Sequence, residues 1–258
     1  EIACCDWSSD VCSSDLGALD FAGGTVVHIS AGFSALAFAL VIGPRKGFGR
    51  TSFGPSNIPF SVLGAGLLWM GWFGFNGGSA LAANGLAITA VVTTNTAAAA
   101  AGVTWMFLSW LDNKPSVLGI VTGAVVGLVA ITPGAGFVTP MAAPAIGATA
   151  AIISYYAIKL IKGRFHIDES LDVFACHGLG GLWGALATGL FATLAVNEAG
   201  ANGLFYGNPG QFVIQLAAAL VAVAFSFGVT FGLAKLLQAV MGLRVSSNEE
   251  EVGLDISE

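Results

Sequence analysis

Seven apolar runs, each about twenty residues long, dominate this chain. An α-helix rises about 1.5 Å per residue, so a run of this length crosses a hydrocarbon core of about 30 Å. Only 9% of the residues are charged, whereas soluble domains usually carry about 25%. We therefore predict an all-α integral membrane protein with about seven transmembrane helices, since helices satisfy their own backbone in lipid. The predicted spans are residues 18–42, 60–80, 86–111, 117–133, 140–161, 171–194 and 209–241.

The two ends of the chain differ from this apolar body. Residues 1–16, EIACCDWSSDVCSSDL, are polar, repeat Ser-Ser-Asp, and resemble the translation of a sequencing adapter. We expect this segment to be non-native or disordered, and the natural protein to begin upstream with further spans. Residues 17–243 form the predicted transmembrane domain and residues 244–258 a polar tail. Two interpretations of the tail stay open, a solvated end and a regulatory docking segment.

The basic residues predict the orientation of the chain. All nine follow spans one, three, five or seven or lie near the ends of spans five and seven, whereas the loops near 81–85, 133–139 and 196–211 contain none. Because cytoplasmic loops of membrane proteins are enriched in Lys and Arg, we expect a multi-pass protein of the cell membrane with a cytoplasmic C-terminus. No basic patch suggests nucleic acid. The nine residues are Arg45, Lys46, Arg50, Lys114, Lys159, Lys162, Arg164, Lys235 and Arg244.

Two histidines lie inside predicted spans, His28 in the first and His177 in the sixth. Small residues follow both at similar offsets, which is typical of an internal repeat whose halves meet at a shared site. Ionisable groups at membrane depth indicate a pathway for ions or protons. Two neutral imidazoles can hydrogen-bond each other and still offer a polar edge to a solute. The alternative is a packing role; no third ligand at suitable spacing supports a metal site.

A second candidate group lies at the outer end of the second span. Trp72, Phe75 and Ser79 are three and then four residues apart, so they share one helix face. This face fits a cation-π cage for a small cation, or an aromatic belt at the membrane interface. Asp20, at the start of the first span, fits either a cation-attracting mouth or a helix N-cap, and the structural role is favoured.

Four further stretches, GWFGFNGGSALAAN, VVTTNTAAAA, GLVAITPGAGFV and DVFACHGLGGLWGALATG, resemble the ammonium transporter (Amt/MEP/Rh) family, on its Amt branch. The resemblance covers residues 17–258. It implies an eleven-helix inverted-repeat transporter, of which the seven spans match helices five to eleven. Helices one to four have no counterpart here. The resemblance therefore implies an N-terminally truncated fragment that does not enclose a pore by itself.

The resemblance also implies roles for individual residues. His28 and His177 correspond to the twin histidines that line a hydrophobic pore. Trp72 and Ser79 belong to an outer ammonium-recruitment site, Phe75 to the gate below it, and Asp20 supports that site. The family recruits ammonium, deprotonates it and passes ammonia along the pore, without a cofactor and without enzymatic chemistry.

Family members are homotrimers, and bacterial ones are often blocked by a PII-type signalling protein at the cytoplasmic face. Ammonium, ammonia and the lipid bilayer are therefore the other expected partners. Two alternatives to transport stay open, an ammonium sensor of the same fold and a non-conducting half-protein.

Overall fold

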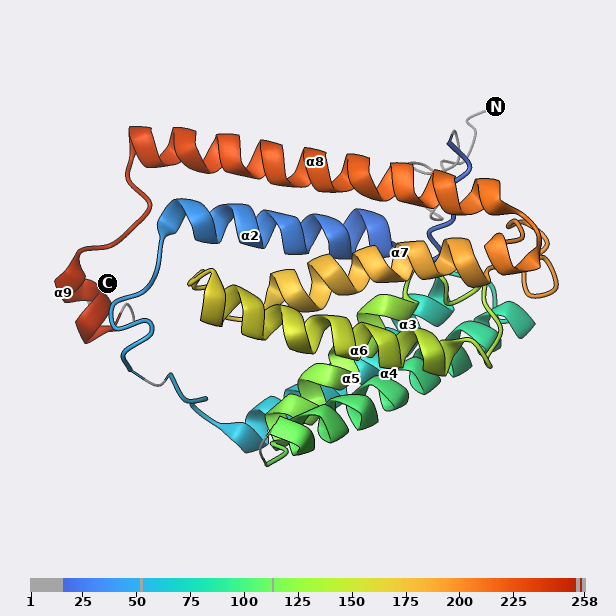
Figure 1. Cartoon of the computed structure of the whole chain (residues 1–258), viewed down its shortest axis with the longest axis horizontal. Coiled ribbons are helices and arrows are strands. Elements are labelled where there is room, and N and C mark those ends of the chain that lie inside the picture. Colours follow the sequence, from blue (N-terminus) through green and yellow to red (C-terminus); the bar gives the residue numbers. More distant parts are fainter. Residues whose placement is uncertain (1–15, 52, 113, 254–255, 257–258) are drawn as a thin grey trace.

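The computed structural model describes residues 16–51, 53–112, 114–253 and 256, and helices dominate this part of the chain (Figure 1). Six helical segments are long and apolar enough to cross a membrane, and a seventh, α5, is shorter. All seven predicted spans therefore form helices. The elements are η2 (Gly24–Ile29), α2 (Ser30–Ile42), α3 (Ile58–Gly78), α4 (Gly85–Asp112), α5 (Val117–Ile131), α6 (Ala143–Lys159), η3 (Leu160–Arg164), η4 (Phe174–Leu179), α7 (Gly180–Phe191), η5 (Leu204–Tyr206), α8 (Pro209–Val240) and α9 (Ser247–Val252).

The helices form one bundle in which α8 runs along α2 and α7, while α4, α5 and α6 pack together on the other side (Figure 1). Small residues allow this close packing. A side chain on Gly127 or Gly147 would collide with the backbone of Ala97 on α4. The core of the bundle is accordingly rich in buried alanines, among them Ala97, Ala101 and Ala143.

The first transmembrane helix begins later than predicted. Residues 18–23 are not helical, and the helix starts at Gly24, after Gly23 with a φ of 91°. Glycine adopts this left-handed conformation without the steric cost that a Cβ brings. His28 is therefore only the fifth residue of its helix, whereas the predicted span, 18–42, placed its start six residues earlier.

A buried glutamine on α8 holds the segment ahead of this helix. Gln215 is 1% exposed, and its side chain donates to the carbonyl groups of Leu19 and Ala185 and accepts from the Leu19 N–H. The neighbouring Gln211 donates to the carbonyl of Gly17. An extended backbone near a membrane helix needs such partners because lipid offers none.

The segment between α5 and α6 is the main departure from the expected topology. Residues 133–139 were predicted as an outer loop, but residues 131–138 are all buried. The Pro133 carbonyl accepts from the Phe21 N–H at 2.9 Å, and the Phe137 carbonyl accepts from the Thr193 N–H at 2.9 Å. Irregular backbone is tolerated at depth when protein surrounds it, so this turn belongs to the core.

The polar tail forms a short helix, α9, that docks on the segment after α2. The side chain of Ser246 accepts from the N–H of Glu249 in a capping box. Glu250 accepts from the Lys46 N–H and pairs with Arg244, and Glu251 pairs with Lys46. These contacts dock α9 on this chain, and a regulatory role of the tail stays a prediction.

We expect α9 to detach in high salt and at low pH. The Lys46 backbone N–H and the Arg244 side chain lower the pKa of Glu250, so this contact is present above the usual carboxylate range and is lost as the pH falls through the lowered pKa. Exposed ion pairs are also screened by salt. Hydrogen exchange of residues 247–252 measures the release. Lys46→Ala should speed exchange at neutral pH, whereas the control Lys114→Ala should not; equal exchange in both variants would contradict the docking.

Candidate functional site: a histidine pair at a helix crossing

Both histidines lie in π-helical turns that open a transmembrane helix. His28 is in η2, which continues into α2, and His177 is in η4, which continues into α7. The His28 N–H reaches the carbonyl of Gly23, five residues back, at 3.4 Å. π-helical turns are rare and occur frequently at functional sites, because the extra residue per turn re-aims the side chains. The sequence repeat is thus also a repeat of local structure.

The two histidine-bearing helices touch at glycines, where a side chain would not fit. A Cβ on Gly32 would lie 2.1 Å from the Gly178 nitrogen and 2.2 Å from its Cα. A Cβ on Gly181, which matches Gly32 in the repeat, would lie 3.1 Å from the nitrogen of Ile29 and 3.0 Å from the Cβ of His28. The glycines therefore bring the backbones of the two helices into direct contact. In each contact, a glycine one turn after one histidine meets the residue directly after the other histidine.

This crossing places the two imidazole rings against each other. The Nδ1 atoms of His28 and His177 are 3.2 Å apart, and the ring centroids are separated by 5.2 Å. In a hydrogen bond between neutral rings, one Nδ1 carries the proton and the other accepts it. It follows that one ring presents an Nε2 acceptor and the other an Nε2–H donor. Besides the bond between the rings, the pair therefore presents one donor and one acceptor.

His28 is 4% exposed, and its Nε2 atom is buried with no hydrogen-bond partner among the described residues. An unpaired polar atom in a buried site costs about 1–3 kcal/mol, so such atoms usually have a function. Here the atom belongs to the ring whose other nitrogen contacts His177. A solute that hydrogen-bonds the pair would satisfy it.

Trp72 and Phe75 of α3 cover the His28 ring. The indole of Trp72 stacks on the imidazole at a centroid distance of 5.2 Å and an angle of 25°, and Phe75 meets it edge-on at 6.2 Å. Trp72 is held by a hydrogen bond from Nε1 to the Thr132 hydroxyl at 2.9 Å. That hydroxyl donates in turn to the Leu128 carbonyl at 2.7 Å. The buried turn after α5 thus holds the indole of Trp72 through Thr132, and this indole packs on His28.

Ser79 lies apart from this cluster. It follows the last residue of α3, and its hydroxyl donates to the carbonyl of Phe75 at 2.9 Å. The structure therefore brings Trp72 and Phe75 to the histidine pair, and leaves Ser79 one helical turn beyond Phe75 at the end of α3.

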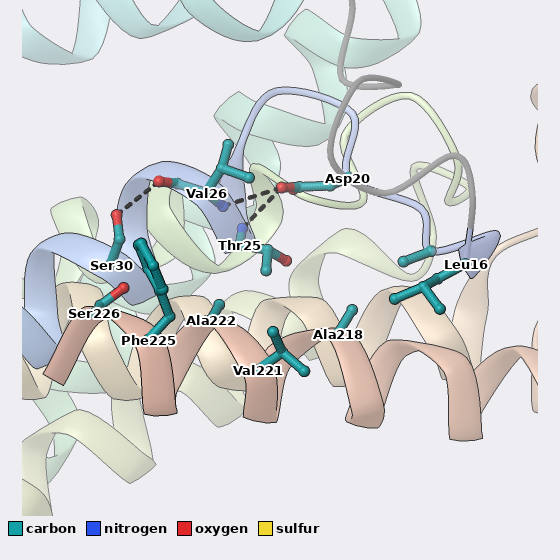
Figure 2. A pocket seen from close by; sticks show the side chains of 11 residues that line it. Leu16, Asp20, Thr25, Val26, Ser30, Ala218, Val221, Ala222, Phe225 and Ser226 are labelled. Carbon is teal, nitrogen blue, oxygen red and sulfur yellow. Dashed lines mark hydrogen bonds between the residues drawn. The ribbon is translucent and has the colours of Figure 1, made fainter. Parts of the chain in front are cut away.

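Asp20 lies ahead of the first π-helical turn and holds its start. Its Oδ2 accepts from the N–H groups of Thr25 at 2.9 Å and Val26 at 3.3 Å (Figure 2). The carboxylate is 3% exposed, so it is not an open cation-attracting mouth in this structure. It also lines a pocket between η2 and α8, together with apolar residues such as Val221 and Phe225 (Figure 2). The contacts favour the capping role over the mouth.

One side of the histidine pair faces an open apolar groove between η2, α2 and α3. Its walls are aliphatic and aromatic, and the two imidazoles are its polar groups. The lining residues are Val27, His28, Ala31, Leu67, Leu68, Gly71, Trp72, Phe75 and His177.

Sequence reasoning missed the residues that hold the site from behind. Pro133 is one: a Cβ on Gly24 would lie 2.3 Å from its Cδ, so the proline ring packs directly on the start of η2. Thr132 is the second, through its bond to Trp72. Both are in the GLVAITPGAGFV stretch, and a proline followed by two nearby glycines inside an apolar sequence was the available signal.

The fold and the site together define a class: a multi-pass α-helical membrane protein with a histidine pair at the crossing of two repeat-related helices, beside an apolar groove. The model of the ammonium transporter family matches residues 1–258, and the chain belongs to that family. Ammonium transporter Amt1 of Archaeoglobus fulgidus is 57% identical over 244 residues, which are 94% of this chain and 61% of that protein.

Solved structures agree with this assignment. The crystal structure of Saccharomyces cerevisiae Mep2 matches with a TM-score of 0.85 at 36% identity, covering 91% of this chain and 55% of the other. A structure named Sensor Amt Protein matches with a TM-score of 0.87 at 35% identity, covering 95% of this chain and 61% of the other. The chain thus spans 55–61% of the length of these relatives.

Proposed function

We propose that this chain forms one wall of a pore that takes up ammonium and passes ammonia across the membrane. The observation that carries the proposal is the hydrogen-bonded pair of His28 and His177 on an apolar groove. An ammonium ion in such a groove would lose its hydration without a counter-ion, at a high cost in free energy. Neutral ammonia is both a donor and an acceptor of hydrogen bonds, so it matches the donor and acceptor that the pair presents.

The proton must therefore leave before the solute reaches the histidine pair. We assign recruitment of the cation to the outer end of α3, with Trp72 and Ser79 at the site, Phe75 as a gate and Asp20 as support. Phe75 suits a gate because its ring is 40% exposed and stands edge-on to both His28 and Trp72. A ring that rotates there would open or close the groove above the imidazoles.

Orientation and partners belong to the same proposal. Lys46 and Arg244 contact α9, and Arg45, next to Lys46, pairs with Asp168 in the loop before η4, so these basic residues lie at one end of the bundle. By the enrichment of basic residues on the inner side, this end and the C-terminus are cytoplasmic in the cell membrane. A homotrimer and a PII-type signalling protein at this face are the partners that we propose from the family resemblance.

A flux measurement on a chimera tests the proposal. Residues 17–258 of this chain replace the matching segment of the Archaeoglobus relative, so that the remaining part of that protein completes the fold. In proteoliposomes given an inward ammonium gradient, we expect a change of internal pH faster than in protein-free vesicles. A chimera that inserts, keeps its helical content and shows no flux above protein-free vesicles would refute transport.

Sensing is the second candidate function, because a structure named Sensor Amt Protein is among the matches. A sensor of this fold would bind ammonium at the same outer site and signal through a change in shape. The chimera experiment separates the two functions. In both, ammonium should protect the chimera from thermal unfolding, but only a transporter should also show flux.

A further inference from the structure

The loop between η3 and η4 carries three acidic residues close together, each with a different partner. Asp168 accepts from the Arg45 backbone N–H at 2.9 Å and from its guanidinium at 2.8 and 2.7 Å. Asp172 pairs with Lys162 at 2.7 Å. Glu169 forms no ion pair with another described residue: its Oε2 accepts from the N–H of Phe174, the first residue of η4, at 3.0 Å.

We propose that Glu169 is the positioning residue for His177, and that it holds η4 as Asp20 holds η2. Asp20 precedes His28 by eight residues, and Glu169 precedes His177 by the same number. Each carboxylate accepts from the N–H five residues ahead, at Thr25 and at Phe174, and each of these residues is three positions before its histidine. The internal repeat therefore includes the capping acid, although one copy is an aspartate and the other a glutamate.

The burial of Glu169 supports a structural role for its contact with Phe174. Glu169 is 7% exposed, and burial raises the pKa of its carboxyl group, while the hydrogen bond from Phe174 acts in the opposite direction. A buried carboxyl group without a partner is costly, so the bond to the start of η4 offsets part of that cost. A solvated loop acid would show neither feature.

The loop that carries Glu169 is strained and needs anchors. His166 has a φ of 54° and Asp172 a φ of 57°, both in the left-handed region that residues other than glycine rarely adopt. Each such residue costs on the order of 1–3 kcal/mol unless its surroundings enforce it. Three contacts hold the loop. Asp168 pairs with Arg45, Asp172 pairs with Lys162, and Glu169 accepts from the Phe174 N–H.

A shift at Phe174 reaches the histidine pair directly. The Phe174 ring stands edge-on to Phe33 of α2, with centroids 5.1 Å apart, and Gly178 presses on Gly32 one turn further on. His177 lies between these two contacts in the same π-helical turn. If the start of η4 loses its cap, we expect His177 to turn away from His28.

Solid-state NMR of the full chain in lipid tests the proposal through the distance between the two Nδ1 atoms, which is 3.2 Å here. The chain carries ¹⁵N-labelled histidine and His166→Asn, which leaves His28 and His177 as the only histidines. We expect a ¹⁵N–¹⁵N dipolar contact in this background and its loss in Glu169→Ala. The control Glu198→Ala removes an exposed acid outside this loop and should keep the contact.

Glu169→Gln separates capping from charge, because its amide oxygen can still accept from Phe174. We expect it to keep the contact between the imidazoles. An intact contact in folded Glu169→Ala would overturn the proposal. Should Glu169→Ala not fold, loss of the contact in folded Glu169→Gln would overturn it instead. The inference rests on the proposed function only for the role of the histidine pair; its test measures the geometry of the pair and is independent of flux.

Discussion

Replacing Gly32 by alanine should prevent the native crossing of the two histidine-bearing helices. The new Cβ would lie 2.1 Å from the nitrogen and 2.2 Å from the Cα of Gly178. Both are backbone atoms, so no change of rotamer relieves the collision, and α2 and η4 must move apart. Overpacking of a core costs about 1–3 kcal/mol, and we expect a loss of about 3 kcal/mol in the free energy of unfolding because the backbone itself is displaced.

Gly64→Ala is the matched control for this variant. Gly64 is also inside a transmembrane helix, α3, but no heavy atom lies within 4 Å of the position of its added Cβ. Alanine there should stabilise the helix by about 0.5–1 kcal/mol, because it restricts the unfolded backbone. Circular dichroism during denaturation by dodecyl sulfate measures both variants. Equal stability of the two would contradict the close crossing.

The apolar spans and the matched histidines could be predicted from the sequence because both follow from simple quantities. The length of an apolar run fixes whether a helix can cross the bilayer, and all seven runs became helices. The small residues after His28 and His177 predicted a close contact between two helices, which the glycines provide. Orientation followed from the basic residues alone and stays a prediction.

The buried turn could not be predicted because its composition is that of a surface loop. Proline and glycine normally mark loops, and loops normally lie at the surface. Here Pro133 packs on Gly24 and Thr132 holds the indole of Trp72, so the turn supports the histidine site from inside. Only the tertiary structure supplies the partners that make a turn stable at this depth.

The π-helical turns escaped prediction for a related reason. No residue type distinguishes a turn with a hydrogen bond to the fifth preceding residue from an ordinary helical turn. The capping acid of the second turn was hidden as well, whereas a capping role for Asp20 was predicted. Asp172 begins the sixth apolar run, but the cap comes from Glu169 three residues earlier. A contact from a loop residue to a helix start depends on the path of the loop, which a strained backbone at Asp172 sets.

In the chimera that tests transport, we expect His177→Ala to abolish flux while leaving insertion and helical content intact. The variant removes one of the two imidazoles that face the groove and leaves the Nδ1 of His28 without its partner. Ammonia in the groove would then lose a hydrogen bond that no water replaces, and such a bond is worth about 4–6 kcal/mol in an apolar medium. Even about 3 kcal/mol added to the barrier corresponds to a fall in rate of about a hundredfold.

The control for this variant is His166→Asn, a change of the third histidine of the chain. His166 is exposed in the loop before η4, and asparagine tolerates its positive φ. Flux of this variant should equal that of the unsubstituted chimera in stopped-flow measurements of internal pH. Undiminished flux in His177→Ala would exclude the histidine pair as the place where ammonia is bound. Equal loss of flux in both variants would instead show that any histidine change disturbs the protein. If ammonia binds at the contact between the two imidazoles, flux should fall in His177→Ala and not in His166→Asn.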